Sequence, residues 1–109
     1  MAKNSDVLYE KIGKTAVITI NRPEKRNAMN EQTRRGIIDS WIKFRDDSDA
    51  NVAIITGSGD VSFSAGNDLA EIYKGGSNDD SWISPIKGAG SLQMAVMQGL
   101  EINKPVIAA

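Results

Sequence analysis

The chain has 109 residues, of which 40% are hydrophobic and 25% are charged, and its formal net charge is -1 at pH 7. This length allows one small domain, and the balanced charge and the lack of a membrane-length apolar run predict no nucleic-acid and no membrane partner. Cysteine and histidine are both absent, which excludes disulfides and thiolate chemistry, and we expect no metal site.

The first residues predict a location and a hairpin. Residues 1–6 are polar with no apolar signal core behind them, so we expect a cytoplasmic protein. A turn at residues 12–14 separates the mixed stretch 7–10 from residues 16–20, which are rich in β-branched side chains. This pattern predicts a β-hairpin whose second strand is the better buried one.

A helix is predicted after the charged loop at residues 21–27. Asn30 is a suitable N-cap for a helix that continues to about Asp46. The apolar face that we expect in the core consists of Thr33, Ile37, Ile38, Trp41 and Phe44. The basic residues predicted to face solvent are Arg34, Arg35, Lys43 and Arg45.

Two strands are predicted next. Residues 52–55 form a continuous apolar run bounded by turns, which is typical of a strand buried on both faces. The Gly-rich residues 56–60 lack the Lys-Ser/Thr pair of a phosphate loop, so we interpret them as a turn. Residues 61–64 are predicted to form the second strand.

The stretch 62–69 is the most informative part of the sequence. Ala65 and Gly66 lack bulk where the chain must bend, and Asp68 is a plausible first-turn residue of a short helix over 68–72. Backbone N–H groups at such a corner can hold a developing negative oxygen. An ordinary strand-to-helix turn is the alternative interpretation.

The C-terminal part adds a loop, a helix and a strand. Trp82 and Ile83 interrupt the predicted loop 74–84, where they either cover a ligand pocket or anchor the loop. Residues 91–102 have helical spacing, and residues 106–109 begin another strand. Because an unpaired apolar strand is a poor place to end a domain, we expect either a truncated piece of a longer protein or a partner that supplies the missing sheet.

Three segments in this order resemble one family. They are ITINRP (18–23) with NAM (27–29), IITG (54–57) with FSAGNDL (63–69), and KPVIAA (104–109). The chain resembles the N-terminal portion of the crotonase superfamily, the enoyl-CoA hydratase/isomerase family. The resemblance implies an α/β fold, a crotonase-like spiral of ββα units that is incomplete here. Residues 1–109 would be the N-terminal part of that domain, with the C-terminal remainder absent.

The resemblance also implies an activity. Family members take coenzyme A thioesters as substrates without a tightly bound cofactor, and they stabilise a thioester enolate in an oxyanion hole of two backbone N–H groups. The first donor corresponds to the amide of Asn67. The second donor and the acidic proton-transfer residues lie beyond the KPVIAA segment in the family, so catalysis would require the missing part. The alternative is a non-catalytic fragment or binding module that keeps part of a coenzyme A or subunit surface.

The remaining site residues follow from the same resemblance. The loop around NAM and the AG corner hold the adenine end of coenzyme A in the family. The residues that this assigns to substrate binding are Lys25, Arg26, Asn27, Ala28, Ala65, Gly66, Asp68 and Leu69. Lys25 and Arg26 either meet nucleotide phosphates or stay solvated, and Asp68 is expected to pin the turn by hydrogen bonding. The partners implied are acyl-CoA and further copies of the chain, in a trimer or hexamer.

Overall fold

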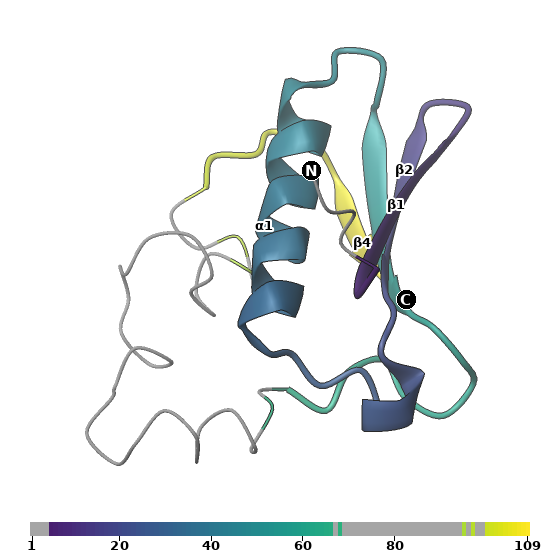
Figure 1. The fold of residues 1–109 in the computed structure, drawn as a ribbon. Helices are drawn as coiled ribbons and strands as arrows, with labels where there is room; N and C mark the ends of the chain where they lie inside the picture. Colours follow the sequence, from purple (N-terminus) through teal and green to yellow (C-terminus); the bar gives the residue numbers. More distant parts are fainter. Residues whose placement is uncertain (1–4, 67, 69–94, 96, 98–99) are drawn as a thin grey trace.

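The fold is described by a computed structural model that covers residues 5–66, 68, 95, 97 and 100–109. Its elements in chain order are β1 (Val7–Ile12), β2 (Thr15–Ile20), the short 3-10 helix η1 (Pro23–Lys25), α1 (Glu31–Asp46), β3 (Val52–Gly57) and β4 (Val106–Ala108). Figure 1 shows α1 beside a single sheet. This mixed arrangement confirms the predicted α/β class.

The predicted hairpin is formed by β1 and β2. The two strands pair antiparallel with Ile12 opposite Thr15, and Gly13 adopts a left-handed φ of 62° in the two-residue turn between them. Every second residue of β2 is buried, namely Ala16, Ile18 and Ile20, whereas β1 is mostly exposed. The second strand is therefore the better buried one, as predicted.

Helix α1 begins where its cap predicts. The Asn30 side chain accepts a hydrogen bond of 2.9 Å from the Thr33 backbone N–H, which satisfies one of the free donors of the first turn. The predicted apolar face is buried against the sheet, and Trp41 is 2% exposed. The Trp41 indole N–H donates to the Ala95 carbonyl at 2.7 Å, so the largest core side chain also has a hydrogen-bond partner.

The prediction for Arg34 is wrong, although Arg35, Lys43 and Arg45 are exposed as expected. Arg34 is 7% exposed, and its guanidinium donates to the Met29 carbonyl at 3.2 Å. The side chain follows the start of α1 back onto the preceding loop, which supplies the acceptor. Helical periodicity does not include that loop, so it could not place this arginine.

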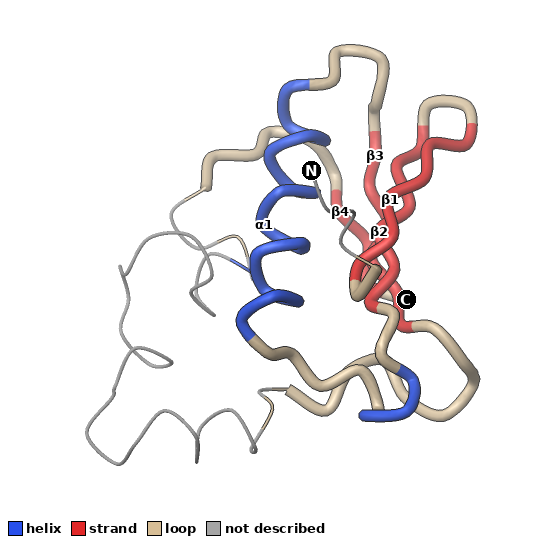
Figure 2. Tube along the Cα trace, in the orientation of Figure 1, coloured by secondary structure: helices blue, strands red, loops and turns tan. Residues whose placement is uncertain are grey.

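The sheet has the order β1-β2-β3-β4, and β2, β3 and β4 are parallel. Figure 2 shows the strands gathered on one side of α1. The connection from β2 to β3 runs through α1, which packs on one face of the sheet. The prediction that β3 is buried on both faces is wrong, because Ala53 is buried but Ile54 is only half-buried. On the face away from α1, Leu8, Ile12 and Ile107 are 43%, 60% and 51% exposed.

The C-terminal segment is anchored to α1. The Lys104 ammonium donates to the carbonyls of Phe44 and Asp47 at 2.8 and 2.6 Å, where cations are favoured at a helix C-terminus. Residues 100–102 are not helical, so the predicted helix 91–102 does not include its last residues. The predictions for residues 69–72 and 74–84, including Trp82 and Ile83, lie outside the described residues. In the described part of the chain, no helix combines the length and the apolar character needed to cross a membrane.

Candidate functional site

Two loops meet at one edge of the sheet. Parallel strands β2 and β3 end in register, with Ile20 opposite Gly57, so the chain leaves both strands at the same edge. The first loop, residues 21–30, contains η1, and the second loop comprises the described residues 58–66 and 68. Figure 1 shows η1 and the start of the second loop at the same end of the molecule. The carboxyl edge of parallel strands is the usual ligand-binding edge of open α/β sheets.

Backbone hydrogen bonds join the two loops. The Ala65 N–H donates to the Arg26 carbonyl at 3.0 Å. The Met29 N–H donates to the Gly66 carbonyl at 2.6 Å, and the Met29 carbonyl accepts from the Asp68 N–H at 2.9 Å. The chain on either side of residue 67 is therefore held against the first loop by main-chain groups, which do not depend on side-chain identity.

Residues 61–64 are not a strand, which corrects the prediction for them. The Ser62 hydroxyl donates to the Arg26 carbonyl at 3.0 Å, and the Ser64 hydroxyl donates to the Asn27 carbonyl at 2.8 Å. These serines bond to an irregular loop, whereas a strand needs the backbone of a neighbouring strand. The alternating V-S-F-S pattern reflects this serine–loop contact and not a buried sheet face.

Asn27 is the polar centre of the two loops. It is 1% exposed and adopts a left-handed φ of 59°. Its side-chain oxygen accepts from the Arg22 N–H at 2.9 Å, and its side-chain amide donates to the Ser58 and Ser62 carbonyls at 3.0 and 2.9 Å. The side chain is engaged within the protein, so the predicted coenzyme A contact of Asn27 would have to come from the backbone around it.

Gly57 is the position where the loops approach most closely. A Cβ placed there would overlap the Phe63 carbonyl oxygen and would lie 2.7 Å from the Asn27 side-chain nitrogen. Real Cβ atoms do not tolerate such contacts with backbone, so this position requires glycine for space rather than for its φ. The second loop can fold over the end of β3 only because no side chain is present there.

Arg22 links the two loops by charge. Its Nη1 donates to the Ala28 carbonyl at 2.7 Å and to the Asp68 carboxylate at 3.1 Å. The side chains of Arg22 and Asp68 are 11% and 16% exposed, so water screens this ion pair only in part. The Asp68 carboxylate is thus engaged within the chain, which agrees with a role in holding the turn.

The remaining predicted residues are arranged around this centre. Lys25 ends η1 and Arg26 follows it in a left-handed conformation with φ 53°, and both side chains are exposed. Ala28 is buried, and Ala65 is exposed. The site residues Asn67 and Leu69 lie outside the described residues. The structure brings the other members of the predicted set together in the two loops.

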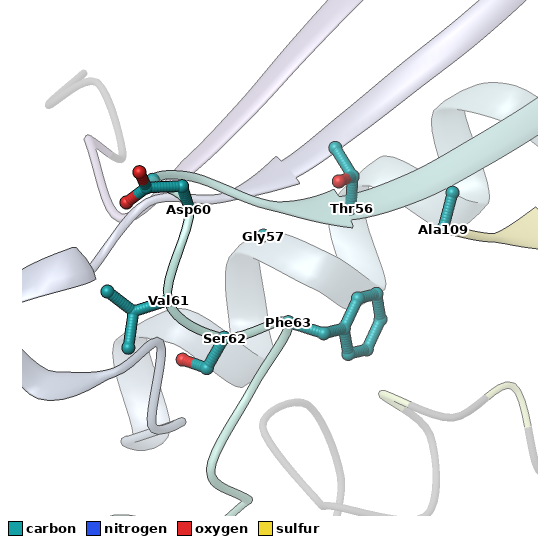
Figure 3. Close-up of a pocket in the computed structure, with 8 residues that line it drawn as sticks. Thr56, Gly57, Asp60, Val61, Ser62, Phe63 and Ala109 are labelled. Carbon is teal, nitrogen blue, oxygen red and sulfur yellow. The ribbon is translucent and has the colours of Figure 1, made fainter.

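A shallow hollow of about 330 Å³ lies beside the second loop, at the ends of β3 and β4 (Figure 3). Figure 3 shows the Phe63 ring next to Thr56 and Ala109, with Val61 and Asp60 farther along the loop. Its lining residues are Thr56, Gly57, Gly59, Asp60, Val61, Ser62, Phe63 and Ala109. The predicted coenzyme A residues do not line it, so it is a neighbouring feature of the same edge.

The described charged groups with a shifted pKa lie at the opposite end of α1, about 24 Å along a 16-residue helix. Lys11 and the backbone N–H of Asp49 surround the Asp47 carboxylate there. Within the residues that the structure describes, no three metal-ligating side chains gather into a cluster. Among the described groups near the two loops, the notable ones are therefore backbone amides, the exposed cations Lys25 and Arg26, and the shielded Arg22 with its carboxylate partners.

Sequence reasoning missed the roles of Arg22 and Gly57. Both stand inside the motifs that carry the family resemblance, but neither received a function. One signal was present for Arg22: a cation two residues after a predicted strand, with a carboxylate in a second loop at the same sheet edge. For Gly57 the signal was its place at the last residue of a strand, where close backbone approach is common.

The chain matches proteins of one kind along most of its length. A family model described as enoyl-CoA hydratase/isomerase matches residues 10–109. The short-chain-enoyl-CoA hydratase of Clostridium acetobutylicum is 38% identical over 108 residues, which cover 96% of this chain and 38% of that protein. The mitochondrial 3-hydroxyisobutyryl-CoA hydrolase of Danio rerio is 42% identical over 72 residues, which cover 66% of this chain and 19% of that protein.

Solved structures also match most of this chain and less than half of their own chains. A probable enoyl-CoA hydratase/isomerase from Mycobacterium abscessus superimposes with a TM-score of 0.75 at 32% identity, covering 99% of this chain and 37% of that one. A carnitinyl-CoA hydratase from Mycobacterium avium superimposes with a TM-score of 0.74 at 30% identity, covering 94% of this chain and 37% of that one. The chain therefore spans less than two-fifths of the length of these relatives.

Proposed function

Because the chain belongs to the enoyl-CoA hydratase/isomerase family, we propose that its two paired loops bind an acyl-coenzyme A thioester and polarise the thioester carbonyl. In this proposal the backbone N–H of Asn67 is one donor of an oxyanion hole. A second donor and the proton-transfer groups come from a region that corresponds to the rest of the longer relatives. Residues 1–109 alone would then bind but not turn over substrate.

One observation carries the proposal. Gly66 and Asp68, the neighbours of Asn67, both direct backbone groups to Met29. Main-chain bonds on both sides of position 67 thus hold the second loop against Met29, which supports our proposal that the amide between them serves a ligand oxygen. Asn67 would act through its amide, so its side chain can vary.

The two exposed cations suit the nucleotide end of the substrate. Lys25 and Arg26 are consecutive and lie on the same turn, and the Arg26 carbonyl is bonded to the second loop. Coenzyme A carries three phosphate groups, which charge-assisted hydrogen bonds from lysine and arginine recognise well. A contact here would hold the nucleotide while the thioester reaches the amide of Asn67.

The chemistry that this arrangement serves is enolate formation. When water adds to an enoyl thioester, the hydroxyl bonds to the β-carbon, the α-carbon gains a proton, and negative charge develops on the thioester oxygen in between. Moving the double bond passes through the same charged oxygen. A fixed N–H donor stabilises that oxygen, and loss of one such donor typically costs about 100- to 1000-fold in rate.

The second candidate is a binding module without catalysis. The exposed apolar side chains Leu8, Ile12 and Ile107 on the outer sheet face favour it, because they offer a surface to another protein segment or subunit. Turnover separates the two candidates. The assay measures hydration of a short enoyl-CoA as the loss of the conjugated thioester absorbance. Hydration by the 109-residue chain alone would contradict our assignment of proton transfer to another region.

A coenzyme A titration tests the binding site directly. We expect Lys25→Ala/Arg26→Ala to raise the Kd for coenzyme A by about tenfold or more, because two charge-assisted contacts are lost. Isothermal titration at low salt and at 0.5 M salt measures this, and the difference should shrink at high salt.

The matched control is Lys14→Ala/Arg35→Ala, which removes the same charges from exposed positions on the β1–β2 turn and on α1. This control should leave the Kd within about twofold. Equal affinities of the two double variants would remove Lys25 and Arg26 from the site.

A further inference from the structure

Arg22 contacts residues from several separate parts of the chain, and the proposed function assigns it no role. It stands two residues after β2, and its guanidinium reaches a carbonyl of its own loop and a carboxylate 46 residues away. Its Nε also lies 3.9 Å from a carboxylate oxygen of Asp6, just before β1. The Thr33 hydroxyl at the start of α1 lies 3.4 Å from that carboxylate, and its closer acceptor is Asn30 Oδ1 at 2.8 Å.

The Arg22–Asp68 ion pair is largely shielded from water, so we expect its loss to destabilise the contact between the two loops. The side chains of Arg22 and Asp68 keep only 11% and 16% of their exposure, and a partly desolvated charge that loses its partner is costly to leave unpaired. Exposed pairs such as Arg35 with Glu31, whose side chains are 51% and 59% exposed, contribute little by comparison. The two pairs share chemistry and differ in burial, so one is a control for the other.

Asp68 directly follows residue 67, whose backbone amide is the oxyanion donor in the proposed function. The Asp68 N–H donates to the Met29 carbonyl, and the Asp68 carboxylate accepts from Arg22, which also holds the Ala28 carbonyl. The first residue after position 67 is thus fixed at two points, once through its backbone and once through its side chain. Both partners belong to the first loop: the Asp68 N–H bonds to Met29, and the Asp68 carboxylate bonds to Arg22.

We propose that Arg22 is a positioning residue that, through Asp68, sets the orientation of the backbone amide at position 67. The proposal rests on the proposed function, because it takes that amide to be the oxyanion donor. In this role Arg22 acts through protein groups and not on the substrate. Its Nη1 donates to an acceptor of each loop while its Nε faces the Asp6 carboxylate, and a lysine ammonium, which is a single point charge, cannot reproduce that planar arrangement.

Steady-state kinetics of the catalytically competent protein tests this role. We expect Arg22→Gln and Asp68→Asn each to lower kcat about 10- to 100-fold, the size of effect that an ångström-scale misplacement produces. The KM should stay within about threefold, because the nucleotide contacts are elsewhere. Arg22→Lys should fall between the wild type and Arg22→Gln. The double variant should lose no more than the worse single variant, because the two residues act as one unit.

Two controls keep the test sharp. Arg35→Gln removes an exposed arginine with a carboxylate partner and should leave kcat and KM unchanged. If Arg22→Gln does not fold, Arg22→Lys and Asp68→Asn still test the claim, because both keep nearly the same volume. A kcat unchanged in Arg22→Gln or in Asp68→Asn would overturn the proposal, and so would losses that multiply in the double variant.

Hydrogen exchange of the 109-residue chain separates this proposal from the proposed function. We expect the Asp68 amide to exchange at least about tenfold faster in Arg22→Gln than in the wild type or Arg35→Gln, while the Ala53 amide of β3 stays protected. If the competent protein processes no enoyl-CoA, the proposed function fails, and the exchange rates still decide whether Arg22 holds this turn. Equal Asp68 exchange in the wild type and Arg22→Gln would overturn the positioning link.

Discussion

At the scale of the single residue, Asn27 shows how much of the site depends on one buried amide. Its oxygen and nitrogen have fixed roles, because the oxygen faces a backbone N–H of Arg22 and the nitrogen faces the carbonyls of Ser58 and Ser62. An aspartate of the same shape would turn a carboxylate oxygen toward those two carbonyls. This substitution would remove both N–H donors and would place a negative charge next to two carbonyl oxygens in a buried site.

We therefore predict that Asn27→Asp lowers the free energy of unfolding by about 2–5 kcal/mol, since two buried carbonyls lose their donor. The matched control is Asn30→Asp, because the Asn30 side chain acts as acceptor for the Thr33 N–H and aspartate is an equally good N-cap. Urea unfolding of both variants measures this. If the two variants were equally stable, Asn27 would not bridge the loops as described.

At the scale of the element, the C-terminal end of α1 carries the pH-sensitive contacts. Asp47 is the C-cap residue, and its carboxylate accepts from the Asp49 N–H at 2.9 Å and from Lys11 of β1 at 3.0 Å. The Asp49 N–H, followed by Lys11, lowers the pKa of Asp47 below the ordinary aspartate value. A lowered folded-state pKa stabilises the fold above the unfolded-state pKa, and the stabilisation is lost as the pH falls through the folded-state value.

Asp47→Asn should for this reason lower Tm relative to the wild type at pH 6–7, and the difference should narrow as the pH falls below about 4. Thermal unfolding followed by circular dichroism at pH 7, 4 and 3 measures the difference. Asp39→Asn, an exposed aspartate on the same helix, is the control, and its difference from the wild type should stay small at each pH. A gap for Asp47→Asn that stays constant with pH would contradict the assigned contacts.

At the scale of the whole molecule, the sequence predicted what depends on local pattern. The hairpin and the Asn30 cap follow from turn chemistry and from capping, which involve neighbours in the sequence. Arg34 and residues 61–64 were mispredicted because their partners lie in a loop that no periodicity describes. The half-buried Ile54 has the same origin, since a run of apolar residues does not show whether a second layer covers the sheet.

The candidate site could likewise be predicted in part from sequence motifs, but not where it depends on contacts between the loops. Family resemblance indicated which residues gather at the carboxyl edge of β2 and β3, and the backbone pairing around Met29 explains how they are held together. The buried role of Asn27 and the ion pair of Arg22 depend on three-dimensional contacts between loops, so motif matching alone did not supply them.

The central claim is that the backbone amide of residue 67, and not its side chain, stabilises the thioester oxygen. Asn67→Pro removes that N–H, whereas Asn67→Ala keeps it and removes only the side chain. In the catalytically competent protein, hydration of a short-chain enoyl-CoA should fall about 100- to 1000-fold in kcat for Asn67→Pro and stay within about threefold of the wild type for Asn67→Ala. Equal rates for the two variants, both folded and both binding coenzyme A, would contradict the account.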